Sequence, residues 1–308
     1  MWRAQSKTTG RRWCRCARSL LIAVLTSGAG CSRPSSSPVV DTARPREQRY
    51  VLHGEIVTVN RERNTLTVTH EAIPGLMPAM TMEFGVTGGD LAIARPGARI
   101  KADLVRDGRG FHLEKVWPDD RADAGGIATA AMALRQDTAA RGAKAYREIG
   151  ETMPDFALYD EDGRIVQAAR FRGRQIMLNF VYSRCPVATM CPAATLRMMA
   201  VQKAAREAGV TNLQLISVTL DPENDTPGVL KEYATARGID TRNFAFLTGP
   251  EAAVRDLLTQ FGVIAEFKDG LLKHSLATLL IDERGRIIHR ADGSEWTVEE
   301  FVDRMRRG

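Results

Sequence analysis

Two cysteines, six positions apart, are the residues of this sequence with the clearest chemical potential. Cys185 follows residues 175–182, an apolar run with the length of a buried strand, and Cys191 precedes Pro192 at the start of a segment with helical spacing. Proline is favoured in the first turn of a helix, and the positive end of the helix dipole favours a thiolate. We therefore predict a strand–loop–helix junction at which both thiols act as a redox pair or as ligands of one metal ion.

A histidine far along the chain is the candidate third ligand. His274 follows the turn signal Asp269-Gly270 and lies at the start of the expected penultimate strand. On spacing alone, a polar surface position explains an isolated histidine better than metal ligation does. A purely structural disulfide is disfavoured, because closing so short a loop restricts the unfolded chain by only about 2 kcal/mol. Zinc is disfavoured because no second pair of cysteines accompanies the first.

A second cluster combines one imidazole with thioethers. Side chains alternate between the two faces of a strand, so Met80 and Met82 share a face with Phe84, and His70 can converge with them from the preceding strand. Thioether sulfur is soft and prefers Cu(I) over Zn²⁺, Mg²⁺ or Ca²⁺. The alternative is that these methionines fill a barrel core. A further methionine, Met77, could supply a third sulfur.

The basic excess of the chain lies in its first 30 residues. The formal net charge is +6, and residues 1–30 hold six basic residues and no acidic one, so the remaining 37 basic residues balance 37 acidic ones. We therefore expect no binding of nucleic acid driven by overall charge. The apolar run at 20–25 is too short to span a bilayer and is typical of an export signal. Small residues before Cys31 resemble a lipoprotein box, in which that cysteine becomes the lipidated N-terminus.

The remainder divides into segments of different composition. Residues 1–30 form the leader, and 31–47, rich in Ser and Pro, form a flexible tether. Residues 48–118 are predicted to be short strands separated by turns. Residues 119–148 form an Ala/Gly-rich linker with one helix at about 128–146. Residues 149–308 alternate strands and helices, which predicts an α/β domain with a mostly parallel sheet and one terminal hairpin.

The elements expected in the second domain follow from its periodicity. The expected strands are 175–182, 213–220, 244–247, 276–281 and 286–289, and the expected helices are 192–208, 227–237 and 250–261, after which residues 297–307 close the chain.

The segment from His70 to Phe84, with Met80-Thr81-Met82, resembles the signature of small periplasmic copper-binding domains of the CusF type. The resemblance covers about residues 50–117. It implies a five-stranded, OB-like all-β barrel that binds Cu(I) through His70, Met80 and Met82.

The second domain resembles the Sco/SenC family, whose members are thioredoxin-like, membrane-tethered copper proteins that help to assemble the copper centre of cytochrome c oxidase. The resemblance rests on the following segments: Met153-Pro-Asp-Phe156, residues 178–186 around Cys185, Cys191-Pro192, Asp221-Pro-Glu-Asn-Asp225-Thr-Pro227 and His274-Ser275. It implies that Cys185, Cys191 and His274 bind copper, as Cu(I), Cu(II) or both. Most members have three residues between the cysteines, whereas this chain has five.

These observations favour an exported, lipid-anchored copper metallochaperone of the cell envelope or periplasm, rather than an enzyme. Its expected partners are the membrane and a copper-receiving protein, a subunit of cytochrome c oxidase. The alternative is a thiol–disulfide oxidoreductase that reduces the cysteines of such a partner through a Cys185–Cys191 dithiol. A peroxidase with the same fold is a third hypothesis, but it leaves the methionine cluster unexplained.

Overall fold

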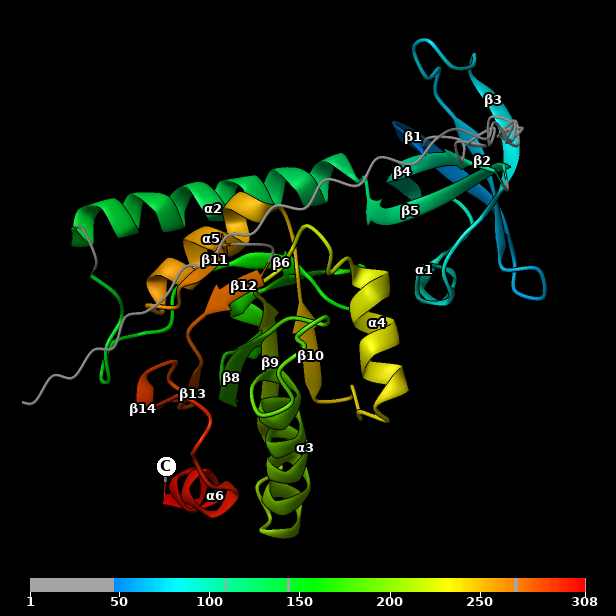
Figure 1. Cartoon of the computed structure of the whole chain (residues 1–308). Coiled ribbons are helices and arrows are strands. Elements are labelled where there is room, and N and C mark those ends of the chain that lie inside the picture. The colour runs from blue at the N-terminus through cyan, green and yellow to red at the C-terminus, as the bar shows by residue number, and fades with distance from the viewer. Residues whose placement is uncertain (1–46, 109, 143–144, 269–270, 308) are drawn as a thin grey trace, which may run out of the picture. The chain divides into compact units, whose positions relative to one another are not determined.

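The computed structural model contains two folded regions. The first is built from short strands whose residues alternate between buried and exposed positions. The structure describes residues 47–307 apart from 109, 143–144 and 269–270. The leader, nearly all of the tether and Cys31 therefore lie outside the described residues. The strands of this region are β1 (Gln48–Asn60), β2 (Thr65–His70), β3 (Met80–Gly85), β4 (Arg99–Asp107) and β5 (Gly110–Pro118), and helix α1 (Gly88–Ile93) follows β3 (Figure 1).

The five strands close into a barrel with the order β1-β2-β3-β5-β4. Its interior is filled by side chains such as Leu52, Leu66 and Phe84, none of which is exposed. The outer face of β2 carries threonines, and Thr69 and Thr81 are joined across β2 and β3 by a hydrogen bond of 2.8 Å. The expected five-stranded barrel is thus present, with apolar residues inside and polar residues outside.

The second region is built on a five-stranded sheet with the order β10-β9-β8-β13-β14. Its strands are β8 (Gln175–Val181), β9 (Leu213–Thr219), β10 (Phe244–Leu247), β13 (Ala277–Ile281) and β14 (Ile287–Asp292). Strands β8, β9 and β10 are parallel, whereas β13 is antiparallel to both β8 and β14. Every residue of β8 and β9 is buried, as expected for parallel strands covered on both faces.

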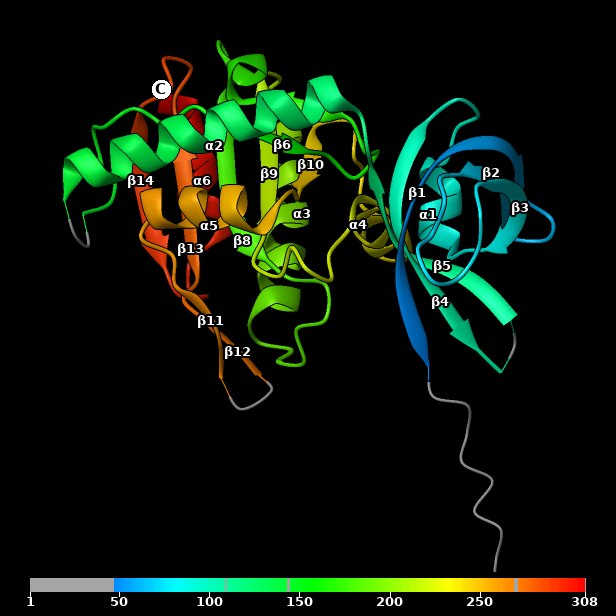
Figure 2. The same ribbon diagram turned by 90° about the horizontal axis from the view of Figure 1, so that it is seen from above.

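Helices cover both faces of this sheet. They are α2 (Arg121–Arg141), α3 (Cys191–Glu207), α4 (Pro227–Ala236), α5 (Glu251–Gln260) and α6 (Val298–Arg307). Helices α2 and α5 lie on one face, and α3 and α6 lie on the other (Figures 1 and 2). Small elements complete the region: β6 (Ala157–Tyr159) with β7 (Ile165–Gln167), the 3₁₀ helix η1 (Ala168–Phe171), and β11 (Ala265–Lys268) with β12 (Leu271–His274).

The expected helix between the two regions begins earlier than its sequence indicates. The Asp120 carboxylate accepts hydrogen bonds from the backbone N–H groups of Ala122 and Asp123 and so caps α2. The helix therefore begins at Arg121, seven residues before the expected start at about 128, and it ends at Arg141, before the expected end at about 146. The helix also packs on the α/β domain, because Ile127 and Leu134 are buried in the core of that domain. Among the described residues, no helix is both long enough and apolar enough to cross a membrane.

Candidate metal centre

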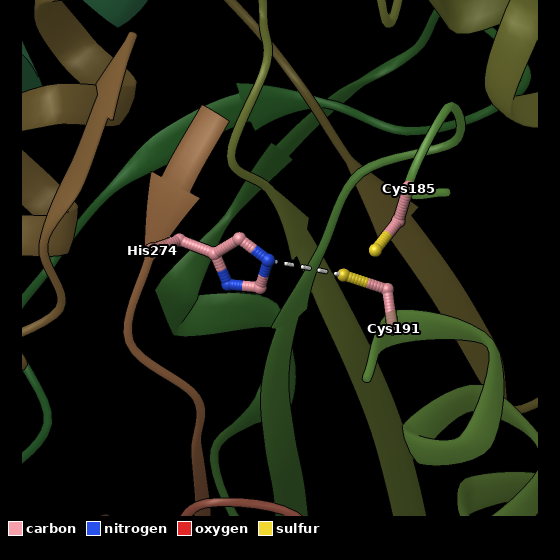
Figure 3. A group of neighbouring side chains, drawn as sticks. All are labelled: Cys185, Cys191 and His274. Atoms are coloured by element: carbon pink, nitrogen blue, oxygen red, sulfur yellow. Dashed lines mark hydrogen bonds between the residues drawn. The ribbon is translucent and has the colours of Figure 1, made fainter. Parts of the chain in front are cut away.

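Cys185, Cys191 and His274 come together at one end of the sheet of the α/β domain. Cys185 lies in the loop after β8, Cys191 is the first residue of α3, and His274 is the last residue of β12. One ligand atom from each residue lies within 4.8 Å of the others. Cys191 Sγ and His274 Nε2 lie 3.7 Å apart (Figure 3). A single metal ion placed among these atoms would have two sulfur donors and one nitrogen donor.

Hydrogen bonding and burial prepare His274 to act as a neutral ligand. Its Nδ1 lies 3.2 Å from the Ser275 carbonyl oxygen, which is the expected acceptor for an Nδ1–H group. That tautomer leaves the lone pair of Nε2 directed toward Cys191. Burial lowers the pKa of His274, although the Ser275 carbonyl opposes this shift. The imidazole and the ring of Tyr182 also pack in a T-shaped arrangement, with the ring centroids 5.4 Å apart.

The thiolate that the helix dipole was expected to favour at the start of α3 is disfavoured by burial in the metal-free protein. Cys191 is fully buried, and this burial raises the pKa of its thiol to about 12. Backbone hydrogen bonds from Tyr182 and from Cys191 itself favour the thiolate, but the negative charge of a Cys185 thiolate opposes it. Burial therefore outweighs the helix dipole, and the buried thiolate needs a cation for compensation. Metal binding at this site should release protons.

A buried carboxylate holds the loop that carries Cys185. Asp225 is completely buried and accepts three hydrogen bonds: from the Ser183 N–H (3.1 Å), the Ser183 hydroxyl (2.5 Å) and the Thr219 hydroxyl (2.6 Å). Because Ser183 lies two residues before Cys185, this network fixes the loop where it leaves β8. Sequence reasoning gave Asp225 no role beyond its place in a family motif.

A second carboxylate of the same segment adds an ion pair. Asp221 accepts a hydrogen bond of 2.7 Å from Nη2 of Arg184, and Asp221 is only 1% exposed. Arg184 is the residue immediately before Cys185. The signal available in the sequence was the pair of acids, four residues apart, that directly follows a buried strand.

The five residues between the cysteines form a turn that still brings the thiols together. The backbone N–H of Met190 donates to the Val187 carbonyl oxygen over 3.0 Å. The Cys185 Sγ lies 3.8 Å from the same carbonyl oxygen. The longer spacing is thus accommodated by local folding of residues 186–190, and it does not separate the ligand atoms.

The histidine and methionines of the barrel lie where the strand pattern predicts. His70 pairs directly with Met80 across β2 and β3, and Val68 pairs with Met82, so these residues share one face. His70 is only 2% exposed, and its Nδ1 lies 2.7 Å from the Glu71 carbonyl oxygen. Its Nε2 is buried and has no hydrogen-bond partner.

The methionine side chains around this nitrogen differ in exposure. Met80 is 44% exposed, whereas Met77 and Met82 are partly buried and pack against the barrel core. Met77 is brought back toward the barrel by a bridge between its backbone and that of Ile73. A buried histidine nitrogen without a partner is costly, and a metal ion is one partner that would satisfy it.

Residues 144–307 match the SCO1/SenC family model, which covers more than half of the chain. The chain belongs to the SCO1/SenC family. Residues 49–118 match the model described as "Copper binding periplasmic protein CusF", so a CusF-like domain precedes the Sco domain. The soft thiol and thioether donors of the two clusters suit copper.

Similar proteins match the Sco domain. An SCO2-like protein of Rickettsia typhi is 29% identical over 164 residues, which are 50% of this chain and 76% of that protein. The SCO1 protein homolog of Bacillus subtilis is 27% identical over 146 residues, 46% of this chain and 74% of that protein. The solved structure of Arabidopsis thaliana ScoI with copper bound has 22% identity and a TM-score of 0.45, and the match covers 52% of this chain and 99% of that one.

Proposed function

We propose that this protein is a copper metallochaperone that carries one copper ion bound by Cys185, Cys191 and His274. The observation that carries the proposal is the convergence of their three ligand atoms within 4.8 Å. Two thiolates and one imidazole are soft to borderline donors, and they hold copper in either oxidation state. Copper here is cargo, so a half-buried site at the end of the sheet suits both loading and release.

The position of His274 favours metal carriage over thiol–disulfide exchange as the main task. A dithiol needs only the two cysteines for redox chemistry, and the imidazole would then be unnecessary. Yet its Nε2 lies 3.7 Å from the Cys191 sulfur, with Nδ1 anchored at the Ser275 carbonyl. An imidazole oriented in this way is the arrangement expected of a metal ligand.

We further propose that the OB-like barrel binds Cu(I) through His70, Met80 and Met82, with Met77 as an additional sulfur donor. The support is the buried Nε2 of His70, which lacks a partner, on the same barrel face as the two methionines. Thioethers are neutral, so this site should select a soft monovalent ion over Cu(II) or Zn²⁺.

The recipient in this proposal is a subunit of cytochrome c oxidase, as the resemblance to Sco/SenC proteins implies. The protein would work in the cell envelope or periplasm, anchored through lipid on Cys31. Several acyl chains give stable anchoring, whereas one gives only marginal binding. Mass spectrometry of the mature protein tests the anchor, since an unlipidated product that starts beyond Cys31 would exclude it.

The variant His274→Ala separates the metal function from the redox function. We expect its Cu(I) affinity at the Cys site to fall by at least about tenfold, or 1.4 kcal/mol, while its dithiol–disulfide potential stays near that of the wild type. His53→Ala, a partly exposed histidine of the barrel that pairs with Asp119, is the control and should retain full affinity. Unchanged copper affinity in His274→Ala would remove the third ligand, and a cellular phenotype restricted to the cysteine variants would favour the oxidoreductase.

A further inference from the structure

Helix α1 of the barrel packs closely on the start of α4. Both belong to the compact unit that spans the chain from residue 44 onward. At Gly89, an added Cβ would lie 2.1 Å from the Gly228 carbonyl oxygen. At Gly228, an added Cβ would lie 2.3 Å from Oδ1 of Asp90. Only glycine at both positions permits so close an approach of the two backbones.

Asp90 lies within this contact. It is 2% exposed, its Oδ2 accepts a hydrogen bond of 2.8 Å from the Thr87 hydroxyl, and its Oδ1 has no partner. Burial raises the pKa of Asp90 to about 6, the bond from Thr87 opposes the shift, and the charges of Glu232 and Glu114 add to it.

A second contact joins the barrel to the segment that precedes α4. Lys115 Nζ on β5 lies 3.4 Å from Oε1 of Glu223. Lys115 has a φ of 50°, the left-handed conformation that non-glycine residues rarely adopt. It lies opposite an irregularity in the pairing of β4 and β5, between Lys101 and Asp103. Such backbone strain persists only where the surrounding structure maintains it.

Both contacts fall on residues 221–228, and the same segment holds the Cys loop. Asp221 pairs with Arg184, and Asp225 accepts two hydrogen bonds from Ser183. Residues 221–228 therefore touch the barrel on one side and the two residues before Cys185 on the other.

We propose that the CusF-like barrel positions the copper site of the Sco domain by docking on residues 221–228. Gly89 and Lys115 are the positioning residues on the barrel, and Gly228 and Glu223 receive them. Docking restrains the segment, and the segment restrains the Cys loop through Asp221 and Asp225. The barrel thus serves the Sco domain even without metal of its own. The inference uses the Cys loop of the proposed function, but it holds whether or not that loop carries copper.

Two adjacent glycines of α1 provide a matched test. Gly89→Ala forces the added methyl group into the Gly228 backbone, whereas a Cβ at Gly88 meets nothing within 4 Å. Both substitutions favour the helix itself to a similar extent, so the difference between them reports docking. Gly228→Ala disturbs the same contact from α4 and provides a second variant whose own helix should not be weakened.

The assay is the rate at which buried Cys191 is alkylated in the reduced, copper-free full chain, followed peptide by peptide by mass spectrometry. Small-angle scattering on the same samples reports docking. We expect Gly89→Ala and Gly228→Ala to enlarge the radius of gyration and to accelerate alkylation at least about threefold, because the open state of the loop becomes more populated. Gly88→Ala should match the wild type. Undocking without faster alkylation would refute the positioning role, and unchanged scattering in both clashing variants would refute the docking. Because no copper is present, failure of the proposed copper function would leave these results unaffected.

Discussion

Replacing Asp225 should release the loop that carries Cys185. In Asp225→Ala, the backbone N–H of Ser183 loses its acceptor, whereas the hydroxyls of Ser183 and Thr219 can rotate toward other acceptors. A buried donor left without a partner costs about 1–3 kcal/mol, and bonds to a charged acceptor are the stronger ones. Burial raises the pKa of Asp225, so the cost of burying the charge offsets part of the stabilisation that these hydrogen bonds give. We expect a net loss of about 3 kcal/mol from these terms.

Asp225→Asn is the informative intermediate. The amide oxygen can still accept from the Ser183 N–H and the Thr219 hydroxyl, and the amide nitrogen can donate to the Ser183 hydroxyl after that hydroxyl turns. The Asn variant therefore loses only the negative charge and the best geometry of one hydrogen bond, which corresponds to a loss of stability of about 1 kcal/mol.

Native-state hydrogen exchange of residues 181–185 measures this effect, because it reports the local opening free energy. The order of protection should be wild type, then Asn, then Ala, and Cu(I) affinity should fall in the same order. Asp155→Ala, in which a carboxylate with 83% side-chain exposure is removed, is the control. Surface substitutions without special roles usually change stability by no more than about 0.5 kcal/mol. If the local opening free energy of the Ala variant lies within about 0.5 kcal/mol of the wild-type value, then Asp225 does not hold the loop.

Two further predictions concern the barrel. In a chain whose cysteine ligands are replaced by serine, the double variant Met80→Leu with Met82→Leu should lose Cu(I) binding, while its folding free energy falls by less than about 1.5 kcal/mol per site. The control Met132→Leu, at an exposed position of α2, should bind Cu(I) as before. Retained Cu(I) affinity in the double variant would assign the two methionines to core packing. Docking of the barrel should weaken as the pH rises from about 4 to about 6, because burial raises the pKa of Asp90 to about 6 in the docked state and the docked state therefore favours the protonated form. Asp90→Asn should remove this dependence and tighten docking at pH 7, as measured by small-angle scattering, and a pH profile that persists in Asp90→Asn would exclude this carboxyl group as its source.

The main strands and helices of the Sco domain could be predicted because each carries a strong apolar pattern. The expected strand at 244–247 agrees with β10, and the expected helices near 192, 227 and 250 agree with α3, α4 and α5 within one residue at each end. The pairs β6–β7 and β11–β12 were not predicted. They have only three or four residues per strand, which is too short for alternation to be recognised. As a result, the sequence predicts His274 at the start of a strand, whereas it is the last residue of β12.

The sequence alone predicts which residues form the candidate site, but it does not predict the pKa values of their side chains. The positions of Cys185 and Cys191 follow from a strand–loop–helix pattern that is visible in the sequence, and the shared face of His70, Met80 and Met82 follows from alternation. The high pKa of Cys191 depends on tertiary burial, which local spacing does not reveal. The role of Asp225 likewise depends on a hydrogen bond to Ser183, 42 residues earlier in the chain.

The most direct test of the copper assignment is the number of Cu(I) ions bound per chain, measured by anaerobic equilibrium dialysis of the reduced protein. We predict one ion at the Cys/His site and one in the barrel. Cys185→Ser with Cys191→Ser should lose the first ion and keep the second. If the wild type and this double variant bind the same number of ions, Cys185, Cys191 and His274 do not form the copper site.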